Sequence, residues 1–165
     1  MGEHSIKIVF DEYESIDMLE DGDRNLLEMA TKACDNAYAP YSSFQVGAAL
    51  LLENGKIICG SNQENAAYPS GLCAERVAMF SASAQYPGVT FMTIAITAKS
   101  RNFTINNPVS PCGSCRQVMA EYETLGKKPL KVILKGENGK IIIIKNISSL
   151  LPLAFNSADL NPGQK

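Results

Sequence analysis

The chain has 165 residues, of which 45% are hydrophobic and 19% are charged, with a formal net charge of −2 and a pI near 5.4. This length suits one domain built around one core, and the composition is that of an ordinary globular protein. The basic residues are scattered, and Lys127–Lys128 is the single adjacent pair. Because binding to long DNA or RNA depends on clustered Lys and Arg, a nucleic acid polymer is not expected as a partner.

Membrane and secretory signals are not expected either. There is no run of eighteen or more apolar residues, which is the length that a membrane-spanning helix needs. The first fifteen residues lack the basic end and apolar core of a secretory signal. The odd count of five cysteines fits reduced thiols better than a closed set of disulfides. We therefore expect a cytoplasmic protein.

The first half of the chain is expected to form an edge strand, a helix and a hairpin. Alternating apolar residues predict a short edge strand over residues 5–10, and the acidic stretch 12–23 predicts a loop or a frayed lead-in to the next helix. Apolar residues at helical spacing predict a helix over 25–37, with Asp21 or Asp23 as its cap. A hairpin should follow, with strands at 44–52 and 56–61 around the turn Asn54–Gly55.

The second half is expected to alternate helices and strands. These elements are a helix at 72–84, a strand at 91–98, a helix at 112–125, strands at 130–135 and 140–145, and a short helix at 147–151. This order predicts an α/β domain in which helices cover both faces of one sheet. Strands that are linked through a helix should be parallel, with right-handed crossovers.

Three cysteines stand at the expected starts of two helices. Cys112 and Cys115 are three residues apart and share one helix face, while Cys73 begins the other helix. The unpaired N–H groups of a first helical turn favour thiolates. If the two helices begin side by side, three sulfurs can lie about 2.3 Å from one zinc ion. Three protein ligands leave a fourth position for water, which is typical of catalytic zinc.

Three other interpretations of these cysteines remain open. The Cys112–Cys115 pair could be a redox motif, but Cys73 would then have no role. The site could be structural, with a fourth ligand from Cys34, Cys59 or His4, although none has the spacing of a zinc motif. The cysteines could also be buried apolar residues, which is the expected role of Cys34 and Cys59. Convergence at two helix starts favours a catalytic metal.

Glu75 and Arg76 follow the first ligand directly. The Glu75 carboxylate is close enough in the sequence to accept and return a proton of a water at the open position. Zinc with three thiolates carries a net charge of −1, which makes it a weaker acid toward water. The Arg76 guanidinium can withdraw charge from the sulfurs, although an ordinary surface arginine is the alternative.

These residues resemble a known family. Cys73-Ala-Glu-Arg76 followed by Pro111-Cys-Gly-Ser-Cys-Arg-Gln-Val118 is similar to the small, homotetrameric cytidine deaminases. Zinc deaminases of this class include a variant with three cysteine ligands, and they use a glutamate that does not bind the zinc as the general acid–base group, which corresponds to Glu75. Relatives outside this branch commonly carry histidine at the position of Cys73, so the cysteine points to nucleoside enzymes. The similarity extends over about residues 25–160 and includes the blocks 37–41, 44–50, 62–66, 68–71 and 150–155.

The resemblance implies a fold and an assembly. It implies a three-layer α/β/α sandwich with a mixed five-stranded sheet, forming one domain over residues 1–165. Residues 1–20 are an N-terminal extension without a clear counterpart, so we assign them no role. The family is tetrameric, with one Zn²⁺ per subunit, and Tyr68 and Gly71 resemble the segment that closes neighbouring sites. Gln45 and Gln63 depart from the family pattern.

The resemblance also implies substrate-binding residues. Asn62 and Glu64 should hold the ribose hydroxyls, for which an amide and a carboxylate are suited. Phe44 should line the base pocket, and Phe155 should reach across a subunit boundary to cover the pyrimidine. The remaining expected contacts are the backbone groups of Ala74 and Ser110, together with Ala66 in the ribose-binding block.

The implied reaction is zinc-dependent hydrolysis of cytidine and 2′-deoxycytidine to uridine and 2′-deoxyuridine with release of ammonia, a step of pyrimidine salvage. Glu75 should carry one proton to N3 of the base and a second to the departing amino group. One alternative is a related zinc deaminase that acts on deoxycytidylate, a blasticidin-type drug or a free base. Another is a non-catalytic, zinc-stabilised interaction module. A polynucleotide editor is disfavoured by the acidic pI.

Overall fold

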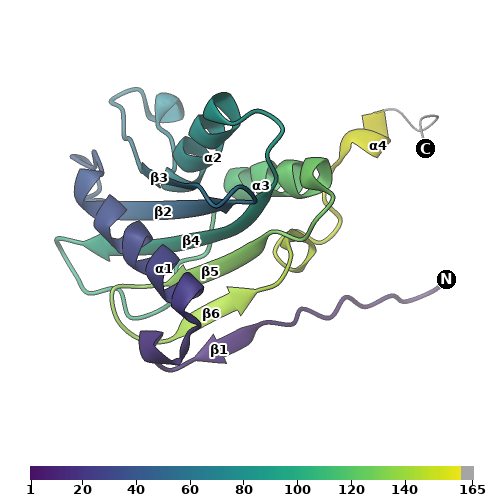
Figure 1. Cartoon of the computed structure of the whole chain (residues 1–165), viewed down its shortest axis with the longest axis horizontal. Coiled ribbons are helices and arrows are strands. Elements are labelled where there is room, and N and C mark those ends of the chain that lie inside the picture. The colour runs from purple at the N-terminus through teal and green to yellow at the C-terminus, as the bar shows by residue number, and fades with distance from the viewer. Residues whose placement is uncertain (161–165) are drawn as a thin grey trace.

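The computed structural model describes residues 1–160, which form one mixed sheet with helices on both faces (Figure 1). The strands stand in the order β1-β6-β5-β4-β2-β3. They are β1 (Asp11–Tyr13), β2 (Phe44–Leu52), β3 (Ile57–Ser61), β4 (Phe91–Ser100), β5 (Lys131–Lys135) and β6 (Ile141–Ile144). The α-helices are α1 (Asp21–Ala33), α2 (Ala74–Gln85), α3 (Gly113–Gly126) and α4 (Ser157–Leu160). Short 3₁₀ turns are found at Ile16–Met18, Cys34–Asn36, Tyr68–Ser70 and Ile147–Ser149.

The strand directions agree with the expected helical crossovers. β4 and β5, which α3 connects, are parallel, with Ile94 opposite Val132. β3 and β4, which α2 connects, also run in the same direction, because both are antiparallel to β2 between them. Helices α2 and α3 therefore begin at the same edge of the sheet.

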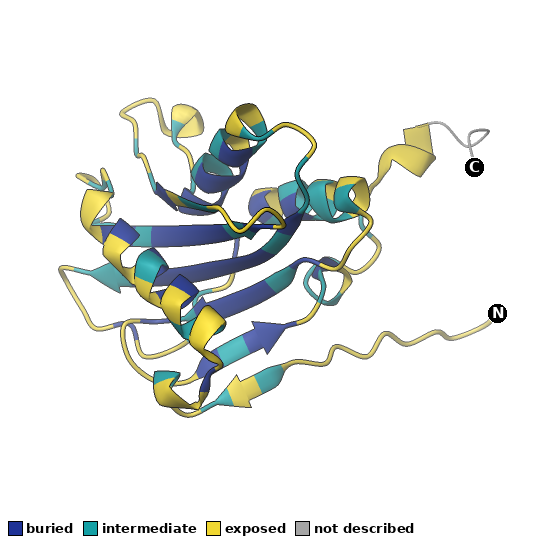
Figure 2. Cartoon of the chain, viewed as in Figure 1, coloured by how far each residue is buried: buried dark blue, intermediate teal, exposed yellow. Residues whose placement is uncertain are grey.

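The two faces of the sheet bury different sets of apolar side chains. Successive residues of a strand point to opposite faces, and Ala48 and Leu50 of β2 accordingly pack toward α2 and α3, while Ala49 packs toward α1. Figure 2 shows that the central strands are buried along most of their length. The expected three-layer sandwich is thus confirmed. Within the described residues, no helix is both long and apolar enough to span a membrane.

The sheet has six strands and not five, because the N-terminal segment adds β1 to the edge of β6. Asp11 lies opposite Ile143 and Tyr13 lies opposite Ile141. The predicted edge strand at 5–10 was wrong, since the strand spans Asp11–Tyr13, and its last two residues fall within the acidic stretch 12–23. Ion pairs between the two segments stabilise this pairing, namely Lys140 with Glu12 (2.6 Å) and Glu14 (3.2 Å), and Lys145 with Asp11 (3.1 Å).

The first helix also differs from the prediction. It starts at Asp21 and ends at Ala33, four residues earlier at each end than expected. Asp21 or Asp23 was expected to cap the helix, but both lie inside its first turn. Their negative charges interact favourably there with the positive end of the helix dipole. The other predicted elements agree to within a few residues, and the Asn54–Gly55 turn is present, with Gly55 at φ +79°. Residues 161–165 of the expected domain lie outside the described part.

Gly60 allows α2 to lie close against β3. A Cβ at this position would be 2.4 Å from the carbonyl oxygen of Ala74 and 2.6 Å from the amide nitrogen of Ala78. Both atoms are helix backbone, so Gly60→Ala should displace the first turns of α2. We expect the free energy of unfolding to fall by about 1–3 kcal/mol, as measured by denaturant titration.

Gly22→Ala is the matched control for this substitution. Gly22 lies in α1, and a Cβ there would have no atom within 4 Å. Because alanine favours a helix by about 1 kcal/mol over glycine, this variant should be as stable as the wild type or slightly more so. If Gly60→Ala were equally stable, the close packing of α2 on β3 would not be a constraint.

Candidate active site

Three cysteine sulfurs converge where α2 and α3 begin. Cys73 is the N-cap residue of α2, Cys112 is that of α3, and Cys115 lies in the first turn of α3. The sulfur of Cys112 is 3.8 Å from that of Cys73 and 3.6 Å from that of Cys115, and all three lie within 4.8 Å of one another. Tetrahedral zinc with bonds of about 2.3 Å would separate its sulfurs by about 3.8 Å. The donor set and its spacing therefore fit zinc.

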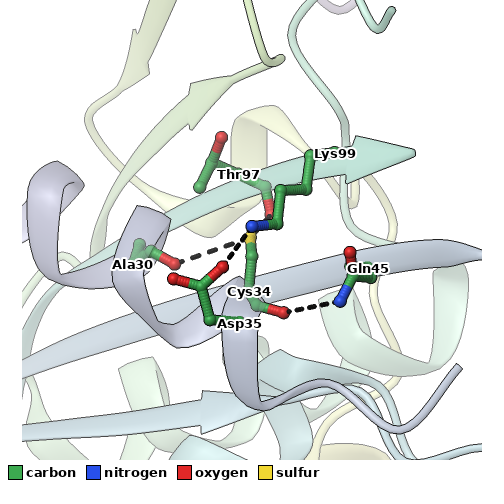
Figure 3. Close-up of polar contacts among 6 residues, drawn as sticks. All are labelled: Ala30, Cys34, Asp35, Gln45, Thr97 and Lys99. Carbon is green, nitrogen blue, oxygen red and sulfur yellow. Dashed lines mark hydrogen bonds and ion pairs between the residues drawn. The ribbon is translucent and has the colours of Figure 1, made fainter. Parts of the chain in front are cut away.

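The other candidate ligands do not join this group. In the part of the chain that the structure describes, the metal-ligating cluster consists of the three cysteines alone. Cys34 lies on the α1 side of the sheet, where its thiol donates to the carbonyl oxygens of Ala30 (3.7 Å) and Thr97 (3.6 Å) (Figure 3). Burial raises the pKa of the Cys34 thiol to about 11. Cys59 was expected to be buried, but it is exposed on β3.

The surroundings of Cys73 favour its thiolate. A hydrogen bond from the Cys115 thiol and the nearby Arg76 guanidinium lower the pKa of Cys73 to about 5. The bond to Cys73 and burial raise the pKa of Cys115. The Nη2 atom of Arg76 is 3.8 Å from the Cys73 sulfur. Arg76 thus lies beside the sulfurs, as its position in the sequence predicted.

Glu75 lies beside the sulfurs on the first turn of α2. Only 4% of the residue is exposed, although it lines the cavity in front of the cysteines. Burial raises the pKa of its carboxyl group, and the negative charge of Cys73 raises it further. A carboxylate with a raised pKa is a stronger base than an ordinary one, which suits it to take a proton from water.

A cavity of about 670 Å³ opens over the sulfurs, which is within the usual range for a small-molecule site. Seven of the predicted substrate-binding, intersubunit and charge-balancing residues line it: Phe44, Asn62, Glu64, Tyr68, Gly71, Arg76 and Ser110. Besides Cys73, Glu75 and Cys112, the lining contains eight residues that were not among the predicted site residues: Tyr41, Ser42, Val46, Gln63, Asn65, Leu72, Ile96 and Val109.

Asn62 follows β3 directly and is held by the backbone of β2. Its Oδ1 accepts a hydrogen bond from the amide of Val46 (2.7 Å), and its Nδ2 donates to the carbonyl oxygen of Phe44 (2.9 Å). An amide group has two donors and two acceptor positions. One donor and one acceptor position therefore remain for a ligand, in a fixed orientation.

Glu64 is oriented by the loop before β2. Its carboxylate accepts hydrogen bonds from the amides of Tyr41 (2.9 Å) and Ser42 (3.3 Å) and from the Ser42 hydroxyl. These bonds, with that of the Ser42 hydroxyl first, lower the pKa of Glu64. The role of Ser42 was not predicted, because its partner Glu64 is 22 residues away in the sequence.

Three predicted substrate contacts lie outside the cavity of this chain. Ala74 is buried in the first turn of α2, and Ala66 is exposed in the loop that follows Asn65. Phe155 is 57% exposed, and its carbonyl oxygen accepts a hydrogen bond from Nε2 of Gln117 (2.8 Å). The roles of these residues stay predictions.

Arg116 links the metal-binding turn to the C-terminal segment. Its Nε donates to the carbonyl oxygen of Pro111 (2.8 Å), and its Nη1 donates to that of Leu150 (2.9 Å). Sequence reasoning missed this role, although the position of Arg116 directly after Cys115 was the available signal. The Arg116 side chain thus holds Pro111, which precedes Cys112, and Leu150, which lies in the segment that leads to Phe155.

Comparison with known proteins shows the family to which the chain belongs. Residues 20–127 match the model described as the cytidine and deoxycytidylate deaminase zinc-binding region. The cytidine deaminase of Halalkalibacterium halodurans is 45% identical over 136 residues, which cover 82% of this chain and 96% of that protein. The crystal structure of cytidine deaminase from Burkholderia pseudomallei is 45% identical, with a TM-score of 0.69, and the match covers 79% of this chain and 97% of that one.

A more distant structure agrees with these matches. The crystal structure of cytidine deaminase from Mycobacterium tuberculosis is 31% identical, with a TM-score of 0.63, and the match covers 83% of this chain and 98% of that one. The family model covers the sulfur cluster, Glu75 and strands β2, β3 and β4. The chain therefore belongs to the zinc-binding cytidine and deoxycytidylate deaminase family.

Proposed function

We propose that this protein catalyses the hydrolytic deamination of cytidine and 2′-deoxycytidine to uridine and 2′-deoxyuridine, with release of ammonia. The observation that carries the proposal is the buried Glu75 carboxyl group beside three converging sulfurs, in a cavity of a size suited to a nucleoside. Relatives that are 45% identical to this chain are named cytidine deaminases.

Cys73, Cys112 and Cys115 hold the zinc ion in this proposal. Bound zinc supplies Lewis acidity, which brings the pKa of a coordinated water toward neutrality. Glu75 takes a proton from the attacking water and delivers it to N3 of the base, while the water oxygen forms a bond to C4. Glu75 then transfers the second water proton to the amino group, so that the C4–N bond breaks and ammonia leaves.

The ribose is placed by Asn62 and Glu64. The Glu64 carboxylate accepts three hydrogen bonds from Tyr41 and Ser42, and because an ionised carboxylate has about four acceptor positions, about one remains for a ribose hydroxyl. Phe44 lies on the wall where a pyrimidine ring can pack against it. We assign the base contacts to the backbone groups of Ser110 and Ala74, and a supporting role in the ribose site to Ala66.

The charge of the cavity favours a nucleoside over a nucleotide. Of the described residues that line the cavity, Arg76 is the sole lysine or arginine, and its guanidinium lies against Cys73. A 5′-phosphate would need a cationic partner of its own. This argues against deoxycytidylate as the main substrate.

We also propose that the enzyme is a cytoplasmic homotetramer that serves pyrimidine salvage, and that residues 1–165 form a single domain with residues 1–20 as its N-terminal extension. Phe155 is exposed and lies outside the cavity of its own chain, which suits a side chain that covers the base in a neighbouring subunit. Tyr68 is 76% exposed at the cavity rim, with its ring edge against Tyr41, and with Gly71 it suits a subunit contact.

A substrate panel tests the proposed function. Ammonia release should be measured with cytidine, deoxycytidine, cytosine, deoxycytidylate and blasticidin, together with the zinc content per chain. We expect about one zinc per chain and turnover of the two nucleosides. Preferred turnover of deoxycytidylate or another panel member would replace the proposed substrate. Zinc without turnover of any of them would favour a non-catalytic module.

Arg76→Gln tests the charge-balancing role of the guanidinium. Loss of its positive charge should leave the sulfurs more electron-rich, and the low-pH limb of the kcat profile should move to higher pH. Arg76→Lys should restore part of the shift. If both zinc retention and the pH profile of Arg76→Gln equalled those of the wild type, Arg76 would be an ordinary cavity-wall residue.

A further inference from the structure

The N-terminal segment presents an unpaired strand edge. We use the term arm for residues 5–13, which comprise β1 and the extended residues before it. The arm leads away from the body of the molecule toward the N-terminus, and its first part is exposed (Figures 1 and 2). β1 pairs with β6 on one edge, and within residues 1–160 its other edge has no strand partner. An open edge of this kind is a template for pairing with another chain.

The exposed residues of the arm are mostly apolar. Ile6, Ile8, Val9 and Phe10 are 58%, 52%, 56% and 48% exposed, although they are large side chains. Ile6, Ile8 and Phe10 alternate along the segment and so share one face of an extended strand. Apolar side chains in this pattern are typical of a strand that is half-buried against a partner.

We propose that the arm pairs in antiparallel fashion with the arm of a second copy of this chain, around a two-fold axis at Val9. In this register Val9 faces Val9 of the partner subunit. Lys7 then lies opposite Asp11, whose carboxylate also pairs with Lys145 of its own chain (3.1 Å), and Ile8 lies opposite Phe10. The two-fold symmetry forms the Lys7–Asp11 pair twice. Opposite charges and apolar pairs that face each other stabilise antiparallel strands. Centring the axis on Ile8 or on Phe10 would lose the Lys7–Asp11 pair.

A second copy is the occupant that the sequence of the arm favours. An interface with two-fold symmetry requires a surface that is complementary to itself, and the Val9-centred register supplies this property. The arm is also separate from the shared catalytic region, because the family model begins at residue 20. Ion pairs with Lys140 and Lys145, which flank β6, anchor the end of the arm. The proposal is therefore independent of the proposed enzymatic activity.

Disulfide trapping tests the pairing directly. In a Cys59→Ser background, which removes an exposed thiol, Val9→Cys would be oxidised with oxidised glutathione and examined by non-reducing denaturing electrophoresis. Paired residues in antiparallel strands have Cα atoms about 4.5–5.5 Å apart, which is within the range of about 4.4–6.8 Å that a disulfide spans. We expect a covalent dimer to be the main product.

Ser5→Cys in the same background is the matched control. Two copies of residue 5 would be separated by eight residues along the paired strands, or about 27 Å, so this variant should stay monomeric on the gel. Adding Ile8→Lys to Val9→Cys should abolish the cross-link, whereas adding Gly2→Lys, outside the pairing register, should preserve it. A monomeric Val9→Cys protein, or equal cross-linking of Ser5→Cys, would overturn the proposal. Turnover should be unchanged in all of these variants.

Discussion

Glu75→Gln should lower kcat by about 10²–10⁴-fold, the usual contribution of a general acid–base group. The amide has nearly the same shape as the carboxyl group, but it cannot carry a proton between water and the base. Glu75 is buried and does not belong to the sulfur cluster, so the zinc content and the circular dichroism spectrum should stay those of the wild type. Steady-state kinetics with cytidine and metal analysis on the same sample measure both quantities.

Glu121→Gln is the control for this experiment. Glu121 is an exposed carboxylate on α3, and its replacement makes the same chemical change outside the cavity. Its kcat should equal that of the wild type. If Glu75→Gln kept a wild-type kcat, another group would have to move the protons, and the proposed role of Glu75 would be withdrawn.

Cys112→Ala should remove zinc from the protein and reduce turnover to the background rate. Cys112 supplies one of three sulfurs that lie within 4.8 Å of one another, and two remaining thiolates hold zinc much less tightly than three. Zinc content after dialysis and ammonia release from cytidine measure the effect. We expect substoichiometric zinc and a correspondingly inactive protein.

Cys59→Ala is the matched cysteine control, because Cys59 is an exposed thiol that is not part of the sulfur cluster. It should retain about one zinc per chain and full activity. A Cys112→Ala protein that retained stoichiometric zinc after dialysis would show that the metal lies elsewhere.

The chemistry of the site could be predicted from the sequence because it is encoded in short, local patterns. Cys73, Glu75 and Arg76 are nearly adjacent, and Cys112 and Cys115 lie within one helical turn, so two helix starts carry the cluster. The three-layer architecture was predictable for a similar reason, since each helix and the hairpin turn at Gly55 has its own local signal.

Features that depend on distant segments could not be predicted. β1 exists because Asp11–Tyr13 pair with β6, about 130 residues away, and three residues carry no periodicity of their own. Two hydrogen bonds likewise join distant segments that are close only in the folded chain. They link Ser42 with Glu64 and Arg116 with Leu150. Individual side chains were therefore predicted more reliably than the partners that orient them.

The position of the three sulfurs on two helices gives bound zinc a mechanical consequence. Cys73 and Cys112 are 39 residues apart in the chain, and the segment between them contains α2 and β4. A zinc ion that joins them is a cross-link which closes this loop and restricts the unfolded chain. The loop-closure entropy of such a segment is on the order of 3 kcal/mol, so the same ion that supports catalysis would also oppose separation of the two helix starts.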